Sequence, residues 1–443
     1  MRHRFVLFWM FLVGAQTLYG QRQLTLEEVI AVALEKNFDV RIARKTSEST
    51  ELDDKYAFNA FLPRVNANGG ISWTGNDQEI RLQNQDGGLV ERTGPTASNN
   101  LTGAVQLDWT LFDGLRMFAT RERVAKLAEQ GELFVKEQMV NTIASVTTNY
   151  YDIVRQKQQL KALMEQLAVN DVRVKLAERR FDVGYAAKPE LLQARVDYNA
   201  TRTLALQQET LIEQLKAQLN GQLGMELPEQ YDVADTIIVN LDLRREDLLQ
   251  SVENTNYSLQ ASRKNVEIAT LAVRERRAEY LPTLQFNSAY SYTRTENTKL
   301  LNPFSPFFIL NNGFNYGFTV SIPVFNGFNQ RRLVQQSRIV QNQQEILFQQ
   351  ERTQVNVALQ NAFSNYENSR RILLVEEENI SLAKENVAIA LEVFRRGAGT
   401  VLDLRTAQQS LLEAYTRLIN ARYLAKVAET ELLRLNGSLL GEE

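Results

Sequence analysis

Two intervals of the chain carry a long, uninterrupted helical pattern. The segments from Gly114 to Gly184 and from Gly327 to Gly397 contain no proline, and each predicts a helix on the order of 100 Å long. After the second glycine, apolar residues recur at alternating spacings of three and four, as in the run ending at Leu435. A seven-residue period is typical of left-handed coiled coils. Each long helix is therefore predicted to turn at its glycine and return as a helical hairpin.

Elsewhere the hydrophobic period changes to two. Apolar and polar positions alternate in four segments, at 64–75, 100–112, 283–294 and 313–326. Runs of about ten residues have the length of a tilted transmembrane β-strand. Aromatic residues within them are candidates for the membrane interface, namely Trp73, Trp109, Tyr290 and Tyr292. A soluble antiparallel sheet would alternate in the same way, so that alternative stays open at this point.

A membrane location for these strands has a consequence for assembly. An open sheet cannot expose unpaired edges to lipid, and single-chain barrels need at least about eight strands. The four predicted strands must then close with strands of other subunits. The sequence therefore predicts an obligate oligomer.

The whole pattern occurs twice. Leu111-Phe112-Asp113-Gly114 recurs as Val324-Phe325-Asn326-Gly327, a shift of 213 positions, and Phe61-Leu62-Pro63 recurs as Tyr280-Leu281-Pro282, a shift of 219. Two copies are too few for a solenoid and indicate a duplicated domain. The predicted organisation is a signal segment at 1–20, a first repeat at 21–222, a linker at 223–242 and a second repeat at 243–443, with helical hairpins at 115–222 and 328–437.

Each repeat is predicted to open with one shorter helix. The first begins at Thr25, which has the spacing of a capping box with Glu28, and runs toward Ala60. The second begins at Arg245 and runs toward Tyr280. Both are expected to end at the Leu-Pro pair, because the residue before proline is driven out of helical geometry.

The N-terminus has the pattern of a secretory signal. Arg2 and Arg4 precede an apolar run from Phe5 to Val13, and small residues follow. The run is too short for a membrane-spanning helix, and a buried N-terminal helix is the other interpretation. Cleavage after Ala15 or after Gly20 fits the pattern.

Composition then narrows the chemistry. The 443 residues include no cysteine and one histidine, His3, which lies in the signal segment. Disulfides, thiol nucleophiles and imidazole catalysis are therefore excluded from the processed chain, and we expect no enzyme, metal or cofactor. Removal of residues 1–20 takes the net charge from −3 to −5, which argues against a nucleic-acid partner. A secreted coiled-coil protein or adhesin and a hydrolase with paired carboxylates are the competing classes.

Three features together resemble the TolC-type outer-membrane efflux proteins, the outer-membrane factor of tripartite efflux and type I secretion systems. They are the opening Leu24–Asn37 segment, the two Leu-Pro strand starts and the two Phe-x-x-Gly turns. The resemblance implies a mostly α-helical fold with a membrane β-barrel, in which a homotrimer forms twelve strands continuous with a helical barrel in the periplasm. It implies a passive conduit whose partners are a periplasmic adaptor (membrane fusion protein), an inner-membrane RND or ABC pump, and outer-membrane lipid.

The resemblance also places candidate sites at the two helical turns. The turns would form the periplasmic tip, and the adaptor-docking candidates are Gly184, Tyr185, Gly397 and Gly399. The candidates for the constriction of the tunnel are Glu190, Asp403, Thr406 and Phe394. Thr406 stands where a second acid is expected and Phe394 lacks the expected hydroxyl, so a reduced closing network is implied. Asp403 also has capping-box spacing with Thr400, and a purely structural role for it stays open.

An apolar loop is predicted between the strands of the second repeat. Residues 299–313 include Phe304, Phe307, Phe308 and Ile309. The loop either folds onto the end of the sheet or contacts another outer-membrane protein.

Overall fold

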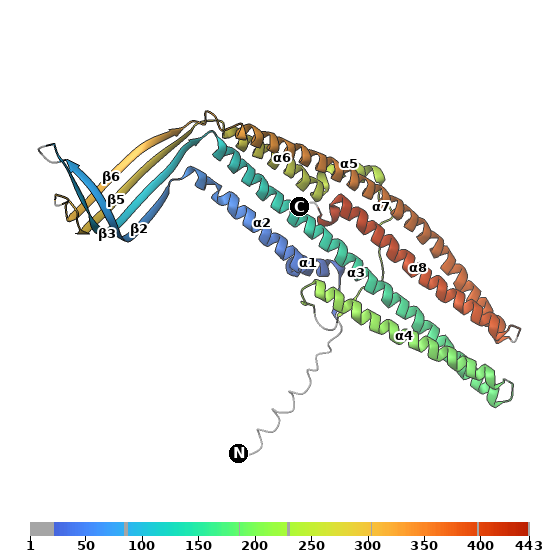
Figure 1. Ribbon diagram of the computed structural model, residues 1–443. Helices are drawn as coiled ribbons and strands as arrows, with labels where there is room; N and C mark the ends of the chain where they lie inside the picture. Colours follow the sequence, from blue (N-terminus) through green and yellow to red (C-terminus); the bar gives the residue numbers. More distant parts are fainter. Residues whose placement is uncertain are drawn as a thin grey trace, which may run out of the picture. The chain divides into compact units, whose positions relative to one another are not determined.

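The computed structural model describes residues 22–83, 87–185, 187–227, 231–302, 304–396 and 398–441 (Figure 1). The predicted signal segment at 1–20 lies outside them. Contacts divide the chain into two compact units, and each unit contains pieces of both predicted repeats. The first comprises Met1–Ser47, Gly131–Ala261 and Gln349–Glu443, and the second comprises Glu48–Gln130 and Ser262–Phe348.

The second unit contains an antiparallel sheet with the order β2-β3-β5-β6. Its strands are β2 (Arg64–Gln83), β3 (Leu89–Asp113), β5 (Thr283–Lys299) and β6 (Phe308–Ser321). Each repeat contributes one hairpin, and β3 pairs with β5 to join the two hairpins. Within the described residues, β2 and β6 each have a neighbour on one side only.

The strand ends differ from the predicted ones. β2 continues to Gln83 and β3 begins at Leu89, because the ladder between them extends through the polar segment where apolar alternation has stopped. β5 likewise continues to Lys299. β6 covers Phe308–Ser321 rather than 313–326, and Pro323, which has no N–H to donate, lies just beyond its end.

The register places the alternating apolar residues of all four strands on one face. Val65 pairs with Leu107, Val105 pairs with Tyr290, and Tyr290 pairs with Phe314. This face is exposed in the single chain, and Phe314 retains 67% of its surface. The opposite face is polar and hydrogen-bonded: Asn287 Nδ2 donates to Asp108 Oδ1 over 2.8 Å. An exposed apolar face of this extent requires an apolar medium or a partner to cover it.

Two helical hairpins account for most of the remaining chain. The first is α3 (Arg116–Asp182) with α4 (Lys188–Gln222), and the second is α7 (Asn329–Arg395) with α8 (Val401–Asn436). Most of the apolar positions predicted on α8 are buried, namely Leu404, Ala407, Ala414, Leu418, Ala421, Ala425, Leu432 and Leu435. The many alanines among them allow close approach of the helices.

The short opening helices are broken, and the prediction of one helix in each repeat was wrong. The first repeat has α1 (Leu26–Lys36) and α2 (Phe38–Tyr56), followed by a 3₁₀ turn at Ala57–Phe61. The second repeat has α5 (Arg245–Thr255) and α6 (Tyr257–Ala278). The predicted capping box of Thr25 and Glu28 is confirmed at the start of α1.

An asparagine causes each break. The side-chain oxygen of Asn37 accepts the N–H groups of Asp39 and Val40, and its amide donates to Gln222 O over 2.8 Å. Asn256 repeats the arrangement: its oxygen accepts the N–H of Leu259, and its amide donates to Leu435 O over 2.8 Å. Each asparagine thus caps a new helix and ties it to the end of a returning long helix.

The linker packs against the first hairpin. β4 (Tyr231–Val233) pairs in parallel with β1 (Arg22–Leu24). Tyr150, 1% exposed, donates to Leu24 O and accepts the N–H of Ala234. Burial raises the pKa of the Tyr150 hydroxyl, so it remains a neutral donor at physiological pH.

Candidate functional site at the helical turns

The first turn joins α3 to α4 around Gly184. Gly184 has φ = +79°, and the N–H of Tyr185 donates to Arg180 O over 2.7 Å, which closes the end of α3. The Tyr185 side chain is 81% exposed. The turn therefore presents an aromatic ring outward on a backbone conformation that favours glycine.

The second turn joins α7 to α8. The N–H of Ala398 donates to Val393 O over 3.1 Å. A Cβ atom on Gly399 would lie 3.0 Å from Cγ1 of Val393, so the chain passes close to the helix end at this glycine. Gly397, the remaining docking candidate, lies outside the described residues.

The two candidate acids have different surroundings. Glu190 lies in the first turn of α4, after Pro189, and its carboxylate is 3.4 Å from Arg180 Nη1. Asp403 completes the predicted capping box with Thr400 at the start of α8, which the structure confirms. Hydrogen bonds from the Thr400 side chain and backbone lower the pKa of Asp403. Asp403 is therefore an exposed carboxylate that stays ionised.

The structure brings only some of the constriction candidates together. Glu190 and Phe394 line one small crevice of about 30 Å³, together with Arg173, Leu176, Ala177, Arg180, Ala194 and Val401. Asp403 and Thr406 are not among its lining residues. The Thr406 hydroxyl donates to Leu402 O, one turn earlier on the same helix, over 3.0 Å. Phe394 is therefore one of the side chains that line this crevice beside Glu190.

A third acid, not identified from the sequence, joins the two hairpins. Asp197 on α4 is 3.3 Å from Arg173 on α3 and 3.2 Å from Arg405 on α8. The Asp197 side chain is only 14% exposed, which makes this contact more shielded than the pairs around it. One sequence signal pointed here: Asp197 lies seven residues after Glu190, on the same face of the helix. Its partner on α8 depends on how the hairpins pack, which spacing alone does not reveal.

The membrane-interface candidates all lie on the apolar face of the sheet. Trp73 is 74% exposed, Tyr290 52%, and Tyr292 37%. Trp109 is 38% exposed, and its indole N–H donates to Phe61 O over 2.8 Å, just before the Leu-Pro pair. Trp109 thus combines an exposed ring with a polar contact, and the location of the four rings at a membrane interface stays a prediction.

The loop between β5 and β6 is hydrogen-bonded to the sheet, but its aromatic side chains are exposed to solvent. Arg92 donates to Leu301 O over 3.4 Å, which links the loop to β3. Phe304 is nevertheless 92% exposed and Phe307 70% exposed. Both predicted roles, folding onto the sheet and contacting another protein, therefore stay predictions.

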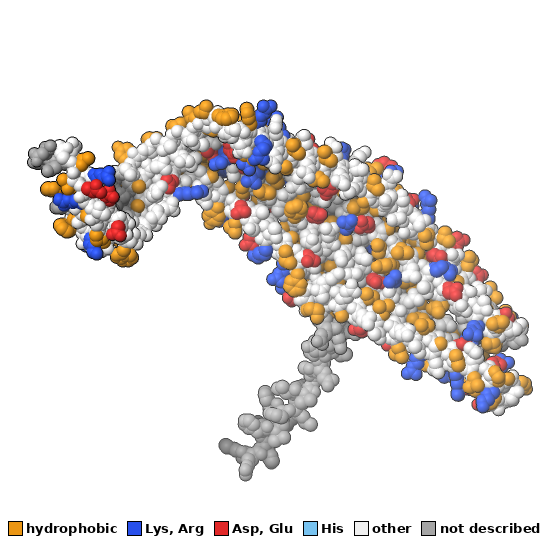
Figure 2. Space-filling model, viewed as in Figure 1, with side chains coloured by type: hydrophobic (Ala, Val, Ile, Leu, Met, Phe, Trp, Pro, Cys, Tyr) orange, Lys and Arg blue, Asp and Glu red, His pale blue; other side chains and the backbone are white. Residues whose placement is uncertain are grey.

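The described helices and side chains offer little other chemistry. None of the described helices is both long enough and apolar enough to cross a membrane. Within the same ranges, no three carboxylate or histidine side chains gather to hold a metal ion. On the face shown in Figure 2, acidic and basic side chains alternate along the helices without forming a field of one sign.

The paired helical hairpins, the apolar-faced sheet and the exposed turns are the arrangement of an outer-membrane channel of the efflux class. The model of the outer membrane efflux protein family matches residues 29–225 and 248–438, and the chain belongs to this family. The two matched ranges overlap the two predicted repeats at 21–222 and 243–443.

Individual relatives are distant but cover most of the chain. The outer membrane efflux protein BepC of Brucella suis is 24% identical over 79% of this chain and 75% of its own length. The outer membrane protein TolC of Vibrio cholerae is 21% identical over 86% and 83%. The crystal structure of the Campylobacter jejuni CmeC outer membrane channel superimposes with a TM-score of 0.73 at 16% identity, covering 94% of this chain and 87% of that one.

These findings confirm the family that the sequence resembles, the TolC-type outer-membrane efflux proteins, and its fold. The protein is an outer-membrane efflux channel that extends into the periplasm. Members of the family are channels rather than enzymes. Neither competing class, a coiled-coil adhesin or a hydrolase, explains a family match over both repeats.

Proposed function

We propose that the protein is the trimeric exit duct of a tripartite efflux or type I secretion system. The observation that carries the proposal is the sheet with one exposed apolar face and two edge strands, β2 and β6, that each lack a second neighbour among the described residues. Unpaired edges are not tolerated in lipid, and closure with other copies satisfies them. Three copies of four strands give a twelve-stranded barrel, an even number within the range of membrane barrels.

In this proposal the helices continue the barrel as a periplasmic tunnel. A periplasmic adaptor docks at the exposed turns, where Tyr185 and Gly399 lie, and an RND or ABC pump in the inner membrane supplies the energy. The channel itself conducts passively, without a reaction, and specificity belongs to the pump. Phe394 and the acids Glu190 and Asp403 form the narrow end.

The proposal predicts a heat-modifiable trimer in the outer-membrane fraction. Unheated samples should migrate at three times the mass of the chain on a denaturing gel and heated samples at the mass of one chain. Purified trimer should conduct ions in planar bilayers. A monomer that remains soluble after secretion would contradict the proposal.

A second prediction concerns the acids at the turns. Three copies of Glu190 and Asp403 around one axis would raise the negative potential of the narrow end. The double variant Glu190→Gln with Asp403→Asn is expected to lower the ratio of cation to anion permeability severalfold, measured as reversal potential in a salt gradient. Asp171→Asn removes one charge, which is paired with Lys175 on the same helix, and it should leave the ratio unchanged. If the native protein, the double variant and Asp171→Asn all had the same ratio of cation to anion permeability, the capping role would be the only one left for Asp403.

A further inference from the structure

The β2–β3 hairpin changes the face on which its apolar side chains lie. Along the first part of β2, apolar residues such as Val65 and Trp73 belong to the apolar face of the sheet, and the ladder with β3 continues to Gln83 without a register shift. Successive residues of a strand alternate between its two faces. Ile80 and Leu82 therefore belong to the polar face, and both are half-buried there. At its tip, this hairpin has apolar side chains on the face that is polar elsewhere.

The loop between β5 and β6 covers these two side chains. Ile80 and Leu82 line a cavity of about 550 Å³ together with Leu300 and Leu301 of the loop, which are also half-buried. Of the other β2 residues at this cavity, only Arg81 belongs to the apolar face. The rest belong to the polar face, namely Thr74, Asn76 and Gln78. The loop therefore rests on the polar face of the sheet.

Contacts with β3 hold the loop on the same face. Arg92 Nη1 donates to Leu301 O over 3.4 Å, and a Cβ atom on Gly94 would lie 3.1 Å from Cδ1 of Leu301. Arg92 pairs with Ile80 in the ladder, and Gly94 lies two residues further along β3. Both positions thus belong to the polar face, so β2 and β3 contact the loop from the same side.

The loop brings two aromatic rings to the polar side of the sheet. Phe314 of β6 belongs to the apolar face, so alternation places Ile309 on the polar face and Phe307, two residues earlier, on the same side. The N–H of Asn297 donates to Phe307 O over 2.9 Å, which continues the pairing of β5 with β6 by one residue. Phe307 is 70% exposed and Phe304 is 92% exposed. The sheet therefore leaves both rings largely uncovered.

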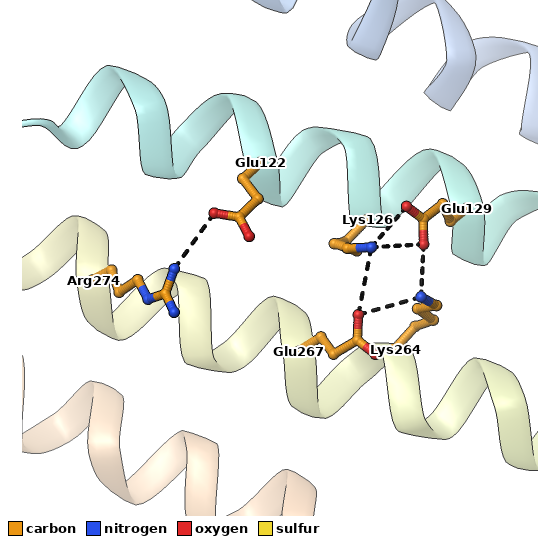
Figure 3. A network of polar contacts seen from close by, with 6 residues as sticks. All are labelled: Glu122, Lys126, Glu129, Lys264, Glu267 and Arg274. Carbon is orange, nitrogen blue, oxygen red and sulfur yellow. Dashed lines mark hydrogen bonds and ion pairs between the residues drawn. The ribbon is translucent and has the colours of Figure 1, made fainter.

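The two strands that flank the loop contacts, β3 and β5, are tied together at their other ends. β3 leads into α3, and α6 leads into β5. An ionic network joins α3 to α6: Glu129 is 2.6 Å from Lys264 and 2.8 Å from Lys126, and Lys126 is also 3.7 Å from Glu267 (Figure 3). These side chains belong to the same unit of the chain as the sheet. The network supports the register of β3 with β5, on which the position of the loop depends.

We propose that the β5–β6 loop narrows the outer mouth of the channel and that Phe304 and Phe307 determine what passes there. The inference rests on the trimer of the proposed function, in which the apolar face of the sheet meets lipid and the polar face lines the pore. A loop that rests on the polar face then lies inside the mouth of the barrel. Three copies of the loop bring their phenylalanine rings toward one axis.

This outer constriction selects by a different chemistry from the narrow end at the helical turns. Glu190 and Asp403 would favour cations there by their charge. Phenylalanine rings carry no charge, and a hydrophobic constriction opposes hydrated ions because water leaves it readily. Aromatic or amphiphilic cargo gains contact with the rings and passes more easily than a small ion. Exported cargo thus meets charge first and apolar surface last.

Single cysteines test the direction of the loop, because the native chain contains no cysteine. Phe304→Cys, treated in membranes with a flexible bis-maleimide, is expected to give covalent dimers and trimers on a heated denaturing gel. Leu89→Cys is the matched control, because Leu89 is 77% exposed at the tip of the β2–β3 hairpin and pairs with Gln83 on the side of the apolar face. It should react with the reagent and stay a monomer.

Currents through planar bilayers test the role of the rings. A bulky, positively charged thiol reagent added from the outer side should lower the current of Phe304→Cys to less than half, and it should leave that of Leu89→Cys unchanged. The double variant Phe304→Ala with Phe307→Ala should conduct more current than the native protein. Phe318→Ala removes a ring that is 67% exposed on the apolar face, and its conductance should equal that of the native protein.

The outcomes separate this inference from the proposed function, provided that each variant forms a heat-modifiable trimer. A native trimer that conducts, combined with no cross-link in Phe304→Cys, would overturn the position of the loop and leave the duct intact. Equal cross-linking of Leu89→Cys would also overturn it. A cross-link in Phe304→Cys without any effect of the reagent on the current would overturn the role of the rings. The absence of any trimer for the native chain would instead overturn the proposed function.

Discussion

Gly437→Ala is expected to abolish recovery of folded protein. Gly437 ends α8 with φ = +74°, and a Cβ atom there would lie 2.2 Å from Thr255 O and 3.0 Å from its carbonyl carbon. The left-handed conformation alone costs an L-residue roughly 1–2 kcal/mol. Relief of the clash would displace the end of α5 and the bond from Asn256 to Leu435 O. The combined loss should reach about 4 kcal/mol or more, the range of exceptional single substitutions.

The same junction in the first repeat provides a graded comparison. Gly224 has φ = +70°, but its Cβ would lie 3.2 Å from Lys36 O, a distance that a small shift can relieve. Gly224→Ala should therefore give folded protein with reduced thermal stability, and Gly441→Ala, where an added Cβ atom would meet nothing within 4 Å, should have the smallest effect. The amount of heat-modifiable trimer in membranes and its dissociation temperature measure the order. Similar yields for Gly437→Ala and Gly441→Ala would contradict a steric origin.

Local chemistry explains which elements could be predicted from the sequence. The long helices, the alternating strands and the Thr25 and Thr400 capping boxes depend on residues close in the chain, and they are present in the structure. The helix breaks at Asn37 and Asn256 escaped prediction. Each asparagine gains its second bond from a carbonyl that is far away in sequence, at Gln222 and Leu435.

Only part of the candidate site could be predicted from the sequence, because some of its contacts join residues that are far apart in the chain. Glu190 follows a proline at a helix start, and Asp403 forms a capping box, so both stood out as acids with a defined local setting. Asp197 lies inside α4, and its only sequence signal, the seven-residue spacing from Glu190, does not reveal a partner. Its importance arises from Arg405, 208 residues later, which the packing of the hairpins brings to 3.2 Å. The contact between Asp197 and Arg405 therefore cannot be predicted from a single sequence.

Breaking the Asp197 cluster is expected to shift the proposed channel toward its open state. Asp197→Asn removes the charge that holds Arg405 of the second hairpin against the first, and it leaves the shielded Arg173 with an amide in place of a carboxylate. A hydrogen bond to a charged group contributes about 1.5–3 kcal/mol. Since 1.4 kcal/mol is a factor of ten, the ratio of open to closed channels should rise roughly tenfold or more. Open probability in planar bilayers measures the change.

Two further variants separate the link between hairpins from a general loss of charge. Arg405→Gln removes only the contact between α4 and α8, and it should open the channel less than Asp197→Asn because Arg405 is 47% exposed and partly screened. Arg195→Gln breaks a pair with Glu178 of 2.8 Å that joins α3 to α4 within one hairpin, and it should leave the open probability unchanged. If Arg195→Gln opened the channel as much as Arg405→Gln, the stability of a single hairpin would control the gate. If only Asp197→Asn and Arg405→Gln raise the open probability, the gate depends on the ion pair between α4 of the first hairpin and α8 of the second.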